Sequence, residues 1–372
     1  MRVLLPLFAL ILVTCAAGPR ADAVPDRTRE TMNRVFDSVA VLMPLAVDEA
    51  AFEAEENRAA IASALETLAA GSDLLQVHGV ERDQGFQHLA RALAADSAAA
   101  RDAFAQGRAG KARYRVRKLT ESCVACHART PADAGGEFGL RLFHNMNVET
   151  LGGAELAQLQ QATRQYDAAL ENYETLLADS SPSRVWSVAD YLALNLRVRG
   201  DLVRPVPVLT ALLASPDLPR WAQRDVKRWL ADLERVAARP ALEDPLEDAR
   251  ALIDGAQAQQ DFPADRQGLV GLLMAARRLD AFLASHPRGE AAAEAYYLLG
   301  RVESRLGTSP RLGQVQSLLE AAIRMAPEGP VARKALDRLE WHLAIEYSGS
   351  GGTTLPEDVR KTLQELRALV EG

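Results

Sequence analysis

The chain has 372 residues, of which 48% are hydrophobic and only 5% aromatic, and its formal net charge is −7. This length is enough for two domains of about 100–200 residues each, and the acidic balance argues against a nucleic-acid partner. Alanine and leucine dominate while β-branched residues are few, so the composition favours an all-α protein.

Residues 1–23 have the features of a secretory signal peptide. Arg2 precedes an apolar run over residues 3–13, and Ala21 and Ala23 form an A-x-A cleavage site. The run is shorter than the ~20 apolar residues that span a bilayer, and no other apolar stretch is long enough to cross one. We therefore expect cleavage after Ala23 and a periplasmic mature chain without a transmembrane helix.

A second outcome is open at Cys15. Residues 12–14 before it resemble a bacterial lipobox, in which the cysteine is lipidated and becomes the first residue of the mature chain. Thr14 stands where glycine or alanine is preferred. The alternative to a free periplasmic protein is therefore a lipoprotein anchored to the membrane at Cys15.

Four amphipathic helices are expected within residues 24–130. Their predicted ranges are 27–43, 52–70, 83–106 and 111–129, because apolar residues recur there at three- and four-residue spacing. Pro44 lies at the end of the first range, and Gly71 is expected to stop the second. Short links between the ranges predict antiparallel neighbours and hence a four-helix bundle.

The motif CVACH lies near the end of the fourth predicted helix and comprises Cys123, Cys126 and His127. Two thiols at this spacing can add to the two vinyl groups of one porphyrin, and the next residue can place a ring nitrogen under the iron. A structural zinc site needs about four ligands, usually as two such pairs, and a thioredoxin-like motif needs a βαβ context. The sequence offers neither. It predicts one covalent haem c, with a redox dithiol and a chance match in an unrelated helix as the remaining alternatives.

A haem motif on the last helix of a four-helix bundle resembles the class II c-type cytochromes, the cytochrome c-prime group. The resemblance covers residues 24–130, and it implies that Cys123 and Cys126 form the thioethers while His127 is the proximal iron ligand. In that family a first-helix residue faces the sixth position, methionine in the low-spin members, and a basic residue one turn earlier lies near a propionate. Met32 and Arg29 stand in about those places.

The first helix offers rivals to Met32. An ungapped count from the second helix puts Asn33 opposite the iron, but Asn33 lies off the apolar stripe and Met32 lies on it. Met43 is also on the stripe, ~16 Å further along the axis at 1.5 Å per residue. Each methionine has the alternative role of core filler. The family often carries an aromatic and a basic residue three and four positions after the haem histidine, where this chain has Thr130 and Pro131.

The fourth predicted helix is strongly basic, with Lys111, Arg113, Arg115, Arg117 and Lys118. Three interpretations stay open: a solvated face, a docking surface for an acidic redox partner, or an intramolecular match to the acidic residues of the second helix region. The remaining histidines are expected to be surface or ordinary residues rather than ligands. They are His78, His88, His144, His286 and His342.

The second half of the chain is predicted to be a helical array. Residues 131–150 are expected to be a linker, residues 151–345 a helical domain, and residues 346–372 a flexible spacer with a last helix over 356–370. The segment 166–173 and the pairs Leu192-Ala193 and Leu299-Gly300 resemble parts of tetratricopeptide repeats, although no full consensus copy is present. Such repeats stack into an α-solenoid whose concave surface binds proteins. A plainly packed α domain is the alternative.

The haem is the only reactive group that the sequence predicts. No serine elbow, phosphate loop or cluster with metal spacing stands out, so we do not expect an enzyme. Two strong axial ligands leave an iron no open position, and such a centre only passes electrons. The expectation is a periplasmic monohaem electron-transfer protein whose repeat domain docks a redox partner. The alternatives are a gas-binding or sensing protein with an open sixth site, and a scaffold in which the haem is structural.

Overall fold

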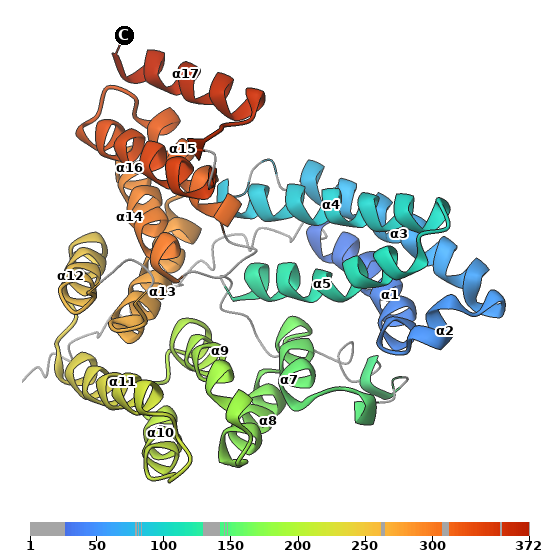
Figure 1. The fold of residues 1–372 in the computed structure, drawn as a ribbon. Coiled ribbons are helices and arrows are strands. Elements are labelled where there is room, and N and C mark those ends of the chain that lie inside the picture. The colour runs from blue at the N-terminus through green and yellow to red at the C-terminus, as the bar shows by residue number, and fades with distance from the viewer. Residues whose placement is uncertain are drawn as a thin grey trace, which may run out of the picture.

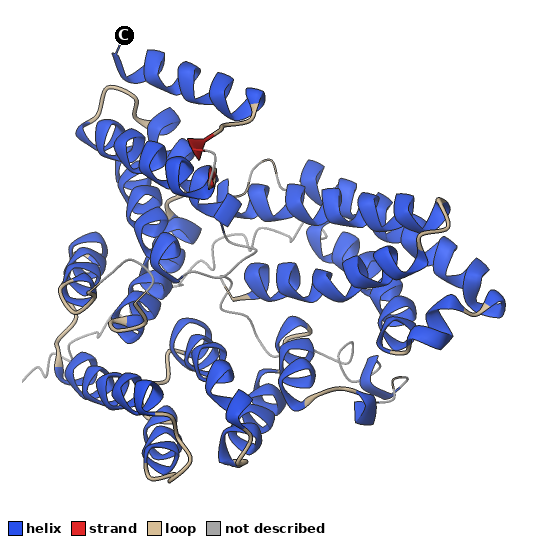
Figure 2. Ribbon diagram, in the orientation of Figure 1, coloured by secondary structure: helices blue, strands red, loops and turns tan. Residues whose placement is uncertain are grey.

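The computed structural model describes residues 27–78, 80, 82, 84–128, 142–144, 146, 148–261, 265–306, 312–349 and 352–371. Most of these residues are helical and the rest are largely loops and turns (Figure 2); the strands described are one small hairpin of β1 (Ser348–Gly349) and β2 (Gly352–Thr353). The predicted all-α class is therefore confirmed. None of the described helices is long and apolar enough to cross a membrane. The expected signal peptide and Cys15 lie outside the described residues.

The N-terminal helices form a group that we call the N-terminal bundle, comprising α1 (Arg27–Val47), α2 (Glu49–Glu53), α3 (Glu55–His78), α4 (Gln84–Ala105) and α5 (Ala109–His127). Contacts run from α1 to α3, from α3 to α4, from α4 to α5 and from α5 back to α1. The short α2 was not predicted; Asp48 caps it by accepting a hydrogen bond from the Ala51 amide at 3.1 Å.

Two predicted helix ends in this bundle are wrong. Helix α1 continues through Pro44 to Val47, because the hydrogen bond that proline removes lies in the last turn and Ala46 beyond it is fully buried. Helix α3 continues through Gly71 for seven more residues. A Cβ at Gly71 would lie 3.1 Å from the Val35 side chain, so this glycine allows α3 to approach α1 closely rather than ending the helix.

The core of the bundle draws on residues beyond α5. Phe52 and Phe104 meet edge to face, with ring centroids 5.8 Å apart. Leu142 and Met146, from the second half of the expected linker, are buried in the same apolar cluster, and so is Leu159. That half of the segment 131–150 therefore packs on the bundle, while residues 129–141 lie outside the described chain.

The C-terminal helices follow one another along a curved path (Figure 1), and most of them pack mainly on their neighbours in the sequence. We call this set the C-terminal array. Its longer helices are α7 (Gly153–Ala162), α8 (Tyr166–Ala178), α10 (Pro205–Leu213), α11 (Arg220–Ala238), α12 (Pro245–Gln257), α13 (Leu269–Ser285), α14 (Glu290–Leu306), α15 (Leu312–Met325), α16 (Pro330–Glu346) and α17 (Glu357–Glu371). Shorter helical segments are η1 (Val148–Thr150), η2 (Pro182–Ser187), α9 (Val188–Ala193) and the π-helical η3 (Leu194–Arg199).

The array touches the bundle at two places, near its start and again at α15. Helix α7 packs on α5, and α15 returns to pack on α4 (Figure 1). At the second junction the His88 Nδ1 lies 2.6 Å from the Ser317 Oγ, although 229 residues separate them in the sequence. His88, expected on the surface, is therefore partly buried at an interface between the two halves of the chain.

A buried ion cluster ties the middle of the array together. Arg197 on η3 lies 2.9 Å from an Asp280 carboxylate oxygen on α13 and 2.7 Å from a Glu303 oxygen on α14, and at most 4% of any of the three side chains is exposed. Because the partners come from three separate helices, the cluster fixes how η3, α13 and α14 sit together.

Candidate haem site

Helix α5 brings the cysteines and histidine of the CVACH motif to one place. Positions three and four residues apart lie on the same helix face, so Cys123, Cys126 and His127 share one side of the last turn of α5. Cys123 and His127 border a cavity, and all three side chains are partly buried.

The cavity lies between α1, α5 and α7 and has apolar walls. Helix α1 contributes six apolar side chains between Met32 and Met43, and α5 contributes Val116 and Leu119 beside the motif residues. The cavity itself has a volume of about 50 Å³, and the space between its walls reaches about 520 Å³ only when the part open to solvent is included. Concave, apolar sites with few polar groups are typical of cofactor binding, and a flat apolar macrocycle suits walls of this kind.

The imidazole of His127 is held in one tautomer. Its Nδ1 lies 2.6 Å from the carbonyl oxygen of Ala162 at the end of α7, and a carbonyl only accepts hydrogen bonds, so Nδ1 carries the proton and donates. Burial, with a smaller contribution from the positive charge of Arg164, lowers the pKa of His127 to about 4. The ring is therefore neutral at pH 7, and Nε2 has a lone pair available for a metal.

Cys123 has the environment of a structural thiol. Burial raises the pKa of the Cys123 thiol to about 11, so it is protonated at neutral pH. Reactive dithiols of the thioredoxin kind depend on a lowered thiol pKa. The surroundings of Cys123 therefore do not favour the redox-dithiol alternative.

The methionines of α1 both line this cavity. Met32 is partly buried and Met43 is 5% exposed, so Met32 shares the cavity with His127 as expected of a distal ligand candidate. Asn33 is not among the described lining residues. The side chain of Arg29 and the residues Thr130 and Pro131 lie outside what the structure describes, so the suggested propionate contact stays a prediction.

Helix α7 is the part of the site that sequence reasoning missed. Leu159, Ala162 and Thr163 line the cavity, and the Tyr166 hydroxyl, at the start of α8, donates to the His127 carbonyl at 3.4 Å. The sequence predicts these residues in a separate domain beyond a linker. No sequence signal marks them, because the contact depends on how a distant segment packs.

The basic side chains of α5 are largely engaged within the chain. Arg113 lies 3.1 Å from Glu49, Arg115 lies 3.1 Å from Asp96, and Arg117 pairs with Glu155. Lys118 pairs with Glu121 on α5 itself. These pairs are intramolecular, but their acids come from α2, α4, α5 and α7, and none of these four pairs uses an acid of the predicted second helix, 52–70.

The other histidines have ordinary surroundings where they are described. His144 is exposed, His286 stacks on Phe282 with ring centroids 4.7 Å apart, and His342 is 6% exposed and lies 3.4 Å from Glu346. The side chain of His78 is outside the described residues. Within the described ranges, no three His, Cys, Asp or Glu side chains lie together as a metal site would require.

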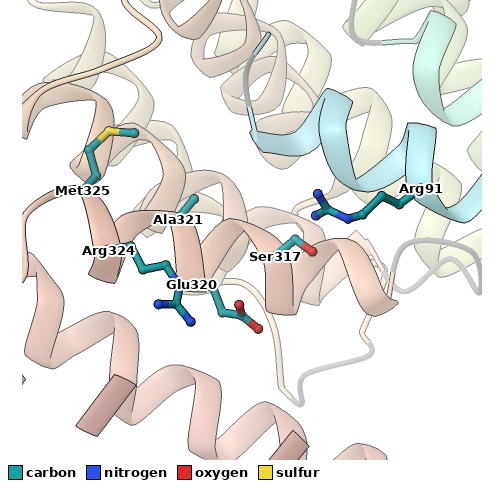
Figure 3. Close-up of a pocket in the computed structure, with 6 residues that line it drawn as sticks. All are labelled: Arg91, Ser317, Glu320, Ala321, Arg324 and Met325. Atoms are coloured by element: carbon teal, nitrogen blue, oxygen red, sulfur yellow. The ribbon is translucent and has the colours of Figure 1, made fainter. Parts of the chain in front are cut away.

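A second hollow lies at the junction of α4 and α15. Figure 3 shows Arg91 on α4 facing Ser317 on α15, with Glu320 and Arg324 one and two turns further along α15. Its lining mixes both charge signs and includes none of the CVACH residues. The cavity beside α5 is therefore the site where the predicted chemistry can be located.

Comparisons with known proteins returned nothing: no family model matches the chain, and neither a curated protein nor a solved structure does.

Proposed function

We propose that the chain is a periplasmic monohaem c-type cytochrome that transfers electrons, with a four-helix haem domain of the cytochrome c-prime kind and a tetratricopeptide-like array that docks a protein partner. One observation carries the proposal. An apolar cavity is bordered by Cys123 and by His127, whose Nδ1 is hydrogen-bonded to Ala162 so that Nε2 can bind iron. The donor set and the apolar walls both fit a covalent haem.

Each residue has a distinct role in this proposal. Cys123 and Cys126 would form the thioether bonds to the haem, His127 would supply a nitrogen ligand to the iron, and Met32 on α1, which lines the same cavity, would supply a sulfur ligand. When bound, the haem supplies a one-electron iron couple whose potential depends on its axial ligands and burial. The apolar side chains of α1 and α5 give the site an apolar lining, and the Ala162 carbonyl holds the orientation of the His127 ring.

The partner role falls to the C-terminal array. Successive helical hairpins that cannot bury their faces alone stack into curved arrays, which offer extended binding surfaces. The basic residues of α5 are a weaker candidate, because Arg113, Arg115 and Arg117 are already paired with acids of the same chain. Export through the predicted signal peptide suits covalent haem attachment, which takes place outside the cytoplasm. A lipid anchor at Cys15 stays the alternative.

The proposal is tested by the intact mass and colour of the mature protein. The full chain is produced in a bacterial host that assembles c-type cytochromes, and we expect a red protein whose mass exceeds that of the mature polypeptide by one haem. The control is the double variant Cys123→Ser/Cys126→Ser, which should carry no covalent haem. A colourless parent protein with the polypeptide mass alone would refute the proposal.

The apolar cavity also favours a second candidate, a gas-binding haem protein with an open sixth site. Its walls present almost no polar surface beside His127, and a diatomic ligand could enter if Met32 does not bind the iron. The absorption spectrum with and without added carbon monoxide distinguishes these two functions. A low-spin reduced spectrum that ignores the gas supports electron transfer, whereas a high-spin spectrum that shifts supports gas binding.

A further inference from the structure

The corner between α7 and α8 has an unusual backbone. Arg164 has φ +61°, and it is the one described non-glycine residue with a positive φ. Its amide donates to the Gln161 carbonyl at 3.1 Å, and the next amide, of Gln165, donates to the Gln160 carbonyl at 2.8 Å. This is the Schellman arrangement that ends many helices, in which the left-handed position is usually glycine.

The same corner is attached to the haem-binding helix on both sides of Arg164. The Schellman bonds use the carbonyls of Gln160 and Gln161, which leaves the Ala162 carbonyl to accept from His127 Nδ1 at 2.6 Å. Tyr166, two residues after Arg164, donates to the His127 main-chain carbonyl at 3.4 Å. The contacts of Ala162 and Tyr166 with His127 therefore hold the backbone of Arg164 beside this histidine.

The charge of Arg164 is not neutralised locally. In the described part of the chain, no carboxylate lies within ion-pair distance of it, whereas the neighbouring Arg199 pairs with Asp167. A left-handed arginine costs roughly 1–2 kcal/mol relative to a residue that tolerates this conformation. Backbone stability alone would favour glycine here, and such local violations are the expected mark of a functional position.

We infer that Arg164 is a residue that tunes the haem: its uncompensated positive charge, held beside His127 by the α7–α8 corner, raises the reduction potential of the iron. The inference rests on the proposed function. A nearby positive charge disfavours the ferric state, which carries one more positive charge than the ferrous state, and burial strengthens this effect because the local dielectric is low. The C-terminal array thereby contributes to the redox property of the bundle.

The test is the reduction potential of haem-loaded full-length variants, measured together with their thermal unfolding. Arg164→Gly removes the charge and relieves the backbone, so the potential should fall while the melting temperature rises. We expect the redox equilibrium with a fixed mediator to shift on the order of tenfold, which is 59 mV for a one-electron couple. Arg164→Lys keeps the charge and should hold the potential close to that of the parent.

A matched control is Arg220→Gln, which removes an exposed positive charge from α11, far from α5 (Figure 1), and should leave the potential unchanged. A merely structural Arg164 would change unfolding without changing the potential. A haem-loaded Arg164→Gly protein with the parent's potential would overturn the role of Arg164 alone. A parent without covalent haem would overturn the proposed function itself, so the two failures are distinguishable.

Discussion

We predict that the buried ion cluster of the C-terminal array is important for the stability of the array. Arg197 is 2% exposed at its side chain, and its partners Asp280 and Glu303 are 4% and 0% exposed. Replacing Arg197 with methionine keeps much of the packing volume but leaves two carboxylates buried without their cation. Removing one partner from a buried pair costs about 3–5 kcal/mol, mainly because the remaining charge stays desolvated.

This cost should be visible in thermal unfolding followed by circular dichroism. For a unit of about 150–250 residues, 1 kcal/mol shifts the melting temperature by roughly 2–4 °C, so Arg197→Met should lower the melting temperature of the array by about 6–20 °C. The matched control is Arg199→Met on the same π-helical segment. Its ion pair with Asp167 is partly exposed, and such pairs contribute about 1 kcal/mol or less.

A compensating variant separates charge from packing. Replacing Arg197, Asp280 and Glu303 together with apolar residues of similar volume removes every buried charge of the cluster, and such replacements are often neutral or stabilising. We expect this triple variant to recover most of the stability lost in Arg197→Met. If the free energies of unfolding of Arg197→Met and Arg199→Met differ by less than about 1 kcal/mol, the buried cluster does not stabilise the array as proposed.

Two further predictions concern the site and the response to pH. Met32→Ala should convert a low-spin haem to a high-spin form that binds carbon monoxide. The control Met43→Ala should keep the parent spectrum and lower the free energy of unfolding by about 2–5 kcal/mol, because it truncates a core side chain. An unchanged Met32→Ala spectrum would show that the axial assignment is wrong. Hydrogen bonds from Arg184 and Ser215 lower the pKa of Asp217 to about 2. Because the folded pKa is below the unfolded value of about 3.9, the stability advantage of the parent over Asp217→Asn should be complete above about pH 4. This advantage should disappear as pH falls through about 2. The measurement is urea unfolding of both proteins at several pH values, and a stability difference that stays constant with pH would contradict the prediction.

Local features of the sequence predicted much of the N-terminal bundle. The range 83–106 corresponds closely to α4 (Gln84–Ala105), because an amphipathic helix is encoded by apolar residues within a few positions of one another. Cys123, Cys126 and His127 share a face for the same reason. The predicted helix ends at Pro44 and Gly71 were wrong. Proline and glycine tend to break helices, but tertiary contacts, such as the close approach of Gly71 to Val35, outweighed that tendency.

Neighbouring residues alone were enough to predict that the chain is helical, that Cys123, Cys126 and His127 lie together on α5, and that an apolar stripe runs along α1. The folded chain was needed to show that α7 lines the cavity, that the Ala162 carbonyl orients His127, and that α15 packs on α4 beside His88 and Ser317. The two kinds of feature differ in the sequence separation of the residues that produce them. Helix periodicity depends on residues within a few positions of one another. Contacts between segments tens to hundreds of residues apart depend on how every helix between them packs.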